Sequence, residues 1–146
     1  MGWYIEKNGS LAEILIVEDN PGDARLFQEY LSEADITNPI AHVSTADQAL
    51  DYVHQRGEFA DQAVPDIVFL DWRLPTATGD EIIRRLPDES GPDIFTIVLT
   101  GSMQDPDSIV PADLGVDGFM TKPLDTDELI SLVRSSQTLS LIERKA

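Results

Sequence analysis

Residues 14–19 of the chain read ILIVED, a short apolar run that ends in two adjacent carboxylates. Three other short apolar runs lead to single polar residues in the same way: residues 67–70 precede Asp71, residues 97–99 precede Thr100, and residues 118–121 precede Lys122. Runs of this length are typical of buried strands, and parallel strands bring their carboxyl ends to one edge of a sheet. The pattern predicts an open α/β sheet with these polar groups gathered at the edge where such sheets bind ligands.

The polar groups suit the phosphorylation of a carboxylate beside a divalent cation. Mg²⁺ prefers oxygen ligands and is usually held by one or two carboxylates with waters and phosphate oxygens, so Glu18, Asp19 and Asp71 are candidate ligands. An aspartate nucleophile forms an aspartyl-phosphate, and the oxygens of the phosphoryl group in transfer need positive charge and hydrogen-bond donors near them. Lys122 and the Thr100 hydroxyl are candidates for that role.

Four motifs make the chain resemble the receiver domains of two-component response regulators. They are Val17-Glu18-Asp19-Asn20, Leu70-Asp71 with Leu74-Pro75 and Gly79, Val98-Leu99-Thr100-Gly101, and Gly118-Phe119 with Lys122-Pro123. The order and spacing of the four motifs are more specific than any one of them. The resemblance implies a flavodoxin-like, doubly wound, five-stranded parallel sheet in strand order 2-1-3-4-5, with helices on both faces.

The resemblance also implies a role for each residue of the site. Asp71 would accept a phosphoryl group from a sensor histidine kinase, and the chain would signal through protein contacts rather than act as an enzyme, with at most self-phosphorylation and self-dephosphorylation. The implied Mg²⁺ ligands are Glu18, Asp19, Asp71 and the main-chain carbonyl of Arg73. The implied phosphoryl-binding and switch residues are Thr100, Lys122 and Phe119, and Pro123 would follow a cis peptide bond.

Each residue taken alone also has a simpler interpretation. Acidic pairs recur in the chain, so Glu18-Asp19 is readily a solvated pair, and Asp71 is readily a turn or capping residue. Two rival functions also stay open. A phosphatase of the haloacid dehalogenase type uses an aspartate after a strand, but it resembles Asp-x-Asp, and this chain has Arg73 two residues on. The other rival is a receiver-like scaffold that takes no phosphate.

Strand and helix patterns alternate five times along the chain, as in a parallel sheet with helices on both faces. After a turn at residues 20–23, apolar residues recur at helical spacing up to Ala34, and residues 40–43 form the second strand. Ser44 or Thr45 then caps the next helix. Further helices are predicted from about Gly79 to Leu86 and from Thr126 onward.

The receiver resemblance covers residues 12–137 and leaves an N-terminal arm, 1–11, and a C-terminal extension, 138–146. The arm either packs back on the domain, meets a partner or stays loose, while the extension is expected to lengthen the last helix and to bury against another subunit in a homodimer. Pro106 and Pro111 fall in the segment 102–114, where receivers carry their fourth helix. A proline inside a helix removes a hydrogen bond, so a short or irregular helix is expected there.

Composition narrows the classes of partner and location. The net charge is −17, with 27 acidic and 10 basic residues, which argues against direct binding to nucleic acids or anionic membranes. The chain has no cysteine, no apolar run near the roughly 20 residues that span a bilayer, and no secretory signal pattern, so a cytoplasmic protein is expected. Its length leaves no room for an output domain, which predicts a stand-alone regulator.

The acidic surface resembles that of cytoplasmic proteins from halophilic archaea, in which aspartate is common and high salt screens the repulsion among carboxylates. An ordinary acidic domain from a low-salt organism is the alternative.

Overall fold

The structure is a computed structural model that describes residues 2–72, 74, 79–85, 94–101, 116–122 and 124–144. Three of the predictions lie outside these residues: the carbonyl of Arg73, the cis bond before Pro123 and the geometry of segment 102–114.

The main sheet has five parallel strands in the order β4-β3-β5-β6-β7. Their bounds are Ile14–Val17 for β3, Ile40–Val43 for β4, Ile67–Asp71 for β5, Phe95–Thr100 for β6 and Gly118–Thr121 for β7. Counted within this sheet alone, the order is 2-1-3-4-5. The predicted flavodoxin-like topology is therefore confirmed.

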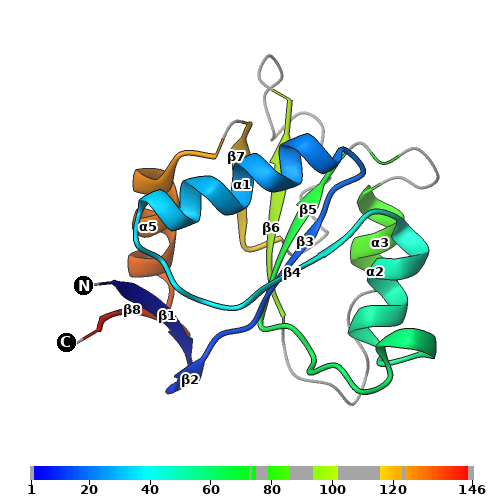
Figure 1. The fold of residues 1–146 in the computed structure, drawn as a ribbon, viewed down its shortest axis with the longest axis horizontal. Helices are drawn as coiled ribbons and strands as arrows, with labels where there is room; N and C mark the ends of the chain where they lie inside the picture. Colours follow the sequence, from blue (N-terminus) through cyan, green and yellow to red (C-terminus); the bar gives the residue numbers. More distant parts are fainter. Residues whose placement is uncertain are drawn as a thin grey trace.

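Helices cover both faces of the main sheet, as predicted (Figure 1). Helices α1 (Pro21–Glu33) and α5 (Thr126–Ser135) pack on one face, and α2 (Ala46–Val53) and α3 (Gly79–Arg85) pack on the other. A short 3₁₀ helix, Gly57–Phe59, follows α2 in the chain. Successive strand residues point to opposite faces, so Ile14 and Ile16 pack toward α1 and α5, whereas Leu15 and Val17 pack toward α2. All four side chains are almost completely buried.

Side-chain caps fix where the helices begin. Asn20 accepts hydrogen bonds from the main-chain N–H groups of Gly22 and Asp23, and Pro21 occupies the first helical position, where its missing N–H is tolerated. The expected turn at 20–23 is therefore wrong, because these residues are the cap and first turn of α1. Thr45 caps α2 and Asp125 caps α5, so the predicted start of the last helix at Thr126 is confirmed.

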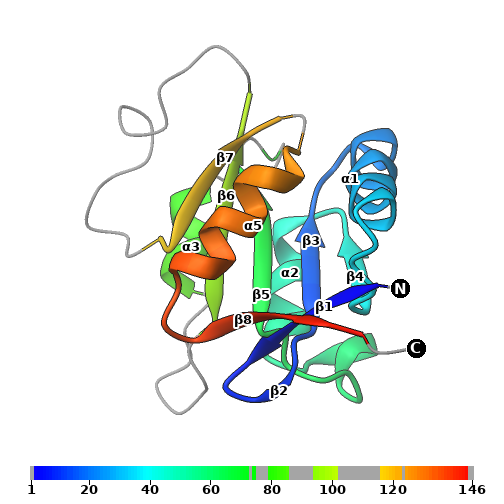
Figure 2. The same cartoon turned by 90° about the vertical axis from the view of Figure 1, so that its left-hand side faces the viewer.

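The two ends of the chain form a second sheet that the sequence pattern did not predict. It is antiparallel, in the order β2-β1-β8, with β1 at Trp3–Lys7, β2 at Ser10–Leu11 and β8 at Leu139–Glu143 (Figure 2). The expected extension of the last helix is wrong, since α5 ends at Ser135 and the chain then becomes extended. The N-terminal arm is not loose either, because Trp3 pairs with Glu143 across this sheet.

A buried asparagine joins the small sheet to the main domain. Asn38, 5% exposed, accepts a hydrogen bond from the Ile5 N–H and donates two, to the carbonyl oxygens of Ile5 and Ala12. At the outer end of the sheet, the Arg144 N–H donates to the carbonyl of Gly2, and its guanidinium lies over the Tyr4 ring. The small sheet thus lies near the amino ends of the parallel strands, away from their carboxyl ends. Among the helices described, none combines the length and apolar content needed to cross a membrane.

Candidate phosphoacceptor and metal site

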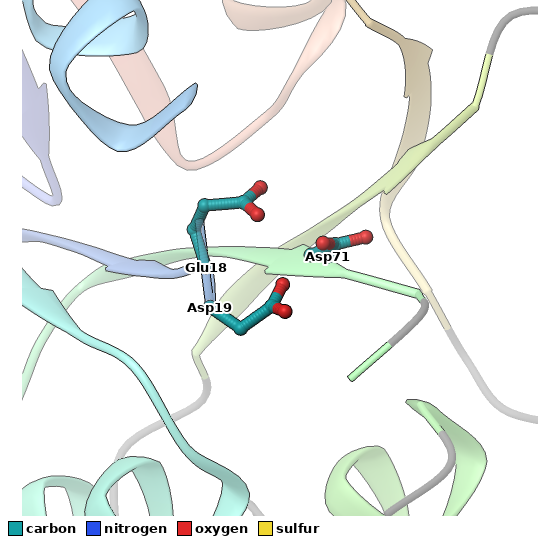
Figure 3. Close-up of side chains that lie close together, drawn as sticks. All are labelled: Glu18, Asp19 and Asp71. Atoms are coloured by element: carbon teal, nitrogen blue, oxygen red, sulfur yellow. The ribbon is translucent and has the colours of Figure 1, made fainter. Parts of the chain in front are cut away.

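Three carboxylates converge at the carboxyl ends of β3 and β5. Glu18 and Asp19 follow β3 directly, and Asp71 is the last residue of β5. One ligand oxygen from each residue lies within 4.8 Å of the other two, and Figure 3 shows the three side chains directed toward one space. Glu18 and Asp71 are buried while Asp19 is exposed, so the cluster has a dry side in the sheet and a wet side toward solvent.

The Lys122 ammonium lies against this cluster. Its Nζ donates to Glu18 Oε2 at 2.5 Å and to Asp71 Oδ2 at 3.2 Å. Lys122 directly follows β7, and its main-chain N–H donates to the carbonyl of Thr100 at the end of β6, which fixes where the side chain starts. The four residues come from three different strand ends, as expected for a ligand site at the carboxyl edge of a parallel sheet.

Burial controls the protonation of Glu18. Its removal from water raises the pKa of the carboxyl to about 7 from the ordinary 4.5; the hydrogen bond from Lys122 opposes this rise and the nearby Asp71 adds to it. Burial alone would lower the pKa of the Lys122 ammonium, but its hydrogen bond to Glu18 and the charges of Asp71 and Glu18 raise it above its ordinary value. Lys122 therefore stays positively charged beside a carboxyl that titrates near neutral pH.

Thr100 and Phe119 occupy neighbouring strands. Thr100 ends β6, is 3% exposed, and its Oγ1 has no hydrogen-bond partner among the described residues. A buried hydroxyl without a partner costs free energy, so a ligand oxygen beside it would be stabilised. Phe119 on β7 is half-buried and packs against the core on the α2 and α3 side.

Two residues that the sequence analysis missed also contact the site. Asp23, in the first turn of α1, places Oδ2 3.5 Å from Lys122 Nζ. On β4, His42 donates from Nε2 to the main-chain carbonyl of Glu18 at 2.8 Å, while the Glu18 N–H donates to the carbonyl of Val43. Both the N–H and the carbonyl of Glu18 are thus hydrogen-bonded to the neighbouring strand β4.

A cavity of about 250 Å³ adjoins the cluster on the α1 side. Its polar end is formed by Glu18, Asp23 and Lys122, and its walls are largely apolar, including Phe27 of α1 and Leu124. Space next to Glu18 and Lys122 therefore opens along α1.

The fold and the site together define an α/β domain with an acidic, lysine-paired centre at the carboxyl edge of its parallel sheet. The family model for the response regulator receiver domain matches residues 14–134, and the chain belongs to this family. Response regulator Rcp1 from Synechocystis sp. is 30% identical over 131 residues, which is 88% of each chain. Other relatives are longer: the transcriptional regulatory protein BaeR from Escherichia coli is 30% identical, and the match covers 84% of this chain but 46% of BaeR.

Solved structures show the same fold. The bacteriophytochrome response regulator AtBRR superposes with a TM-score of 0.73 at 29% identity, covering 86% of this chain and 91% of that one. The phosphorylated cyanobacterial phytochrome response regulator RcpA has a TM-score of 0.66 at 31% identity, with 85% and 89% covered. The Mn²⁺-bound form of Rcp1 has a TM-score of 0.65 at 30% identity, with 85% and 90% covered.

The residues at the centre fit a divalent cation. Three carboxylate oxygens within 4.8 Å repel one another, and a hard cation that prefers oxygen ligands removes this repulsion. The chemistry of the acidic cluster therefore fits a divalent cation.

Proposed function

We propose that the chain is a phosphorylation-activated response regulator in which Asp71 accepts the phosphoryl group from a sensor histidine kinase. The observation that carries this proposal is the convergence of three carboxylates from two strand ends on one space with the Lys122 ammonium in contact. A helix cap or a solvated acidic pair would require neither the convergence nor the ammonium.

Of the three carboxylates, Asp71 is the one that both terminates a strand and contacts Lys122. In the proposed reaction, a carboxylate oxygen of Asp71 forms a bond to phosphorus while the bond from phosphorus to the donor breaks, and the donor leaves with that electron pair. Lys122 and the Thr100 hydroxyl then donate to the phosphoryl oxygens. Both are already at the end of their strands, so little reorganisation is needed.

We assign the metal as Mg²⁺, held by Glu18, Asp19, Asp71 and the carbonyl of Arg73. The cation supplies positive charge for the phosphoryl oxygens. The chain's own contribution is to hold the ligands: β4 fixes the Glu18 main chain through His42 and Val43, and the Asn20 N–H donates to Glu18 Oε1 at 3.2 Å.

The remaining assignments follow the same proposal. Residues 12–137 form the receiver, and output passes through protein contacts that Phe119 alters by changing rotamer when Asp71 is phosphorylated. The regulator is cytoplasmic, where its kinase presents the phosphohistidine, and a cis bond before Pro123 stays a prediction. A homodimer through residues 138–146 and a halophilic source stay predictions.

Two other functions have less support. Arg73 stands where a phosphatase of the haloacid dehalogenase type has its acid, and the chain belongs to the receiver family instead. A scaffold that takes no phosphate would have no need of a buried hydroxyl at Thr100 that no described residue partners, on the strand next to that of the lysine-paired Asp71.

The proposal is tested by incubating the protein with acetyl phosphate and Mg²⁺ and mapping the modification by mass spectrometry. We expect one phosphoryl group on Asp71 and none in Asp71→Asn, which is nearly isosteric and should fold because it removes one charge from a crowded anionic site. Labelling that persists in Asp71→Asn would move the acceptor elsewhere. A wild-type protein that takes no label from acetyl phosphate or from any candidate kinase would leave the scaffold function.

Lys122 offers a second test of the same site. Lys122→Arg keeps a cation next to Glu18, so the fold should survive, but the planar guanidinium cannot reproduce the contact of a compact ammonium. We expect Asp71 to be labelled more slowly in this variant, with the fold checked by circular dichroism. Labelling at the wild-type rate would remove Lys122 from the mechanism.

A further inference from the structure

Asp23 contacts the site without belonging to the acidic cluster. Its Oδ2 lies 3.5 Å from Lys122 Nζ, and its side chain is 45% exposed, compared with 3% for Glu18 and 9% for Asp71. It also lines the cavity that opens from the cluster along α1, together with Glu18 and Lys122. Asp23 is therefore a partly exposed negative charge on the same ammonium that contacts the phosphoacceptor candidate Asp71.

Helix capping accounts for only part of this arrangement. An acidic residue in the first turn of a helix interacts favourably with the helix dipole, and Asp23 occupies that position in α1. The dipole does not require the side chain to reach a lysine that follows β7, 99 residues further along the chain. The contact with Lys122 joins α1 to the phosphoacceptor site and needs a separate explanation.

We propose that Asp23 is a specificity-determining residue that selects against small, strongly anionic phosphodonors at Asp71. The proposal rests on the function assigned above. Asp23 acts in two ways, and both have the same sign. It competes with the phosphoryl oxygens for the Lys122 ammonium. It also repels a donor dianion that approaches from the exposed side of the site.

The distances are short enough for Asp23 to have a measurable electrostatic effect on the phosphorylation of Asp71. Asp23 and Asp71 contact the same ammonium at 3.5 and 3.2 Å, so the two carboxylates lie within a Debye length, about 8 Å at physiological salt. Asp23 is nearly half exposed, which limits its interaction to the range measured for surface charge pairs. This range corresponds to about two- to fivefold in a rate or binding constant.

The experiment compares Asp23→Asn with wild type in the rate of Asp71 phosphorylation at several donor concentrations, in Mg²⁺. In the reaction with acetyl phosphate, a bond forms from an Asp71 oxygen to phosphorus, the bond from phosphorus to the acetate oxygen breaks, and acetate leaves with the electron pair. We expect Asp23→Asn to raise kcat/KM by about two- to fivefold, mainly through a lower KM. The increase should be smaller with phosphoramidate, which carries less negative charge at neutral pH, and it should shrink in 1 M KCl.

A matched control separates this effect from helix capping. Asp127 is also an exposed acid in the first turn of a helix, α5, next to a side-chain cap, and it lines neither the cavity nor the acidic cluster. Asp127→Asn should leave KM for both donors unchanged, and Asp23→Glu should stay close to wild type because it keeps the charge.

Three outcomes would overturn the inference. They are an unchanged KM in Asp23→Asn, the same change in Asp127→Asn, or equal effects on the two donors. If neither wild type nor Asp23→Asn accepts a phosphoryl group from either donor or from any candidate kinase, the proposed function fails, and this inference fails with it.

Discussion

The carboxyl of Glu18 is held between burial, which favours its neutral form, and Lys122, which favours its charged form. Burial prevails, so the folded-state pKa of about 7 lies above the ordinary 4.5 of the unfolded chain. The folded state then binds more protons than the unfolded state between these values. This contribution to stability is fully present below about pH 4.5 and is lost as the pH rises through 7, by at most about 3 kcal/mol.

The same titration predicts how Mg²⁺ acts on the fold. A metal ligand must be deprotonated, so Mg²⁺ competes with the proton on Glu18 and binds more tightly as the pH rises through 7. We expect millimolar Mg²⁺ at fixed ionic strength to raise the melting temperature more at pH 8 than at pH 5.5. In Glu18→Gln, measured in parallel, the pH dependence in EDTA should flatten and the effect of Mg²⁺ should fall. An equal Mg²⁺ effect at both pH values would show that Glu18 does not titrate at the site.

The site residues differ in how well the sequence predicted them. Glu18, Asp19, Asp71 and Lys122 were predictable because each follows or ends a strand, and strand ends meet at one edge whatever the loops do. Asp23 lies on a helix, and whether a first-turn side chain points to the sheet edge depends on how α1 packs. That packing is a tertiary property, so a pattern along the chain carried no signal for the contact with Lys122.

At the scale of elements, the predictable part of the fold is local. The short runs at residues 14–17, 40–43, 67–70, 97–99 and 118–121 predicted all five strands of the main sheet, because buried parallel strands are largely apolar. Strands β1 and β8 were missed since they pair across nearly the whole chain, Trp3 with Glu143, and alternate only weakly. One local signal was present: Asn8-Gly9, both with positive φ, form a two-residue hairpin loop of the kind that joins β1 and β2.

The attachment of β1 predicts the effect of changing Asn38. Asn38→Ala removes three hydrogen bonds and leaves the buried polar groups of Ile5 without these partners. We therefore expect the free energy of unfolding to fall by about 2 to 4 kcal/mol. Amide hydrogen exchange should accelerate first in β1. Asn38→Asp serves as control, because it keeps the acceptor for the Ile5 N–H and loses both donors. Unchanged exchange in β1 for both variants would mean that pairing with β8 alone holds the strand.

The whole molecule carries a net charge of −17, and its response to salt distinguishes the two explanations of that charge. Repulsion among exposed carboxylates opposes the compact state and weakens as the Debye length falls from about 8 Å at physiological salt to about 3 Å at 1 M. If the surface is adapted to high salt, the free energy of unfolding should keep rising from 0.15 M to molar KCl.

A charge-reduced variant separates screening from the general effects of salt on apolar surfaces. Glu33, Glu58 and Asp61 are exposed. The substitutions Glu33→Gln, Glu58→Gln and Asp61→Asn together make the net charge less negative without changing the core or the acidic centre. We expect the variant to gain less stability from KCl than wild type, because it has less repulsion to screen. Urea unfolding at constant Mg²⁺ measures both, and parallel salt curves for the two proteins, or a flat curve for wild type, would indicate an ordinary acidic domain.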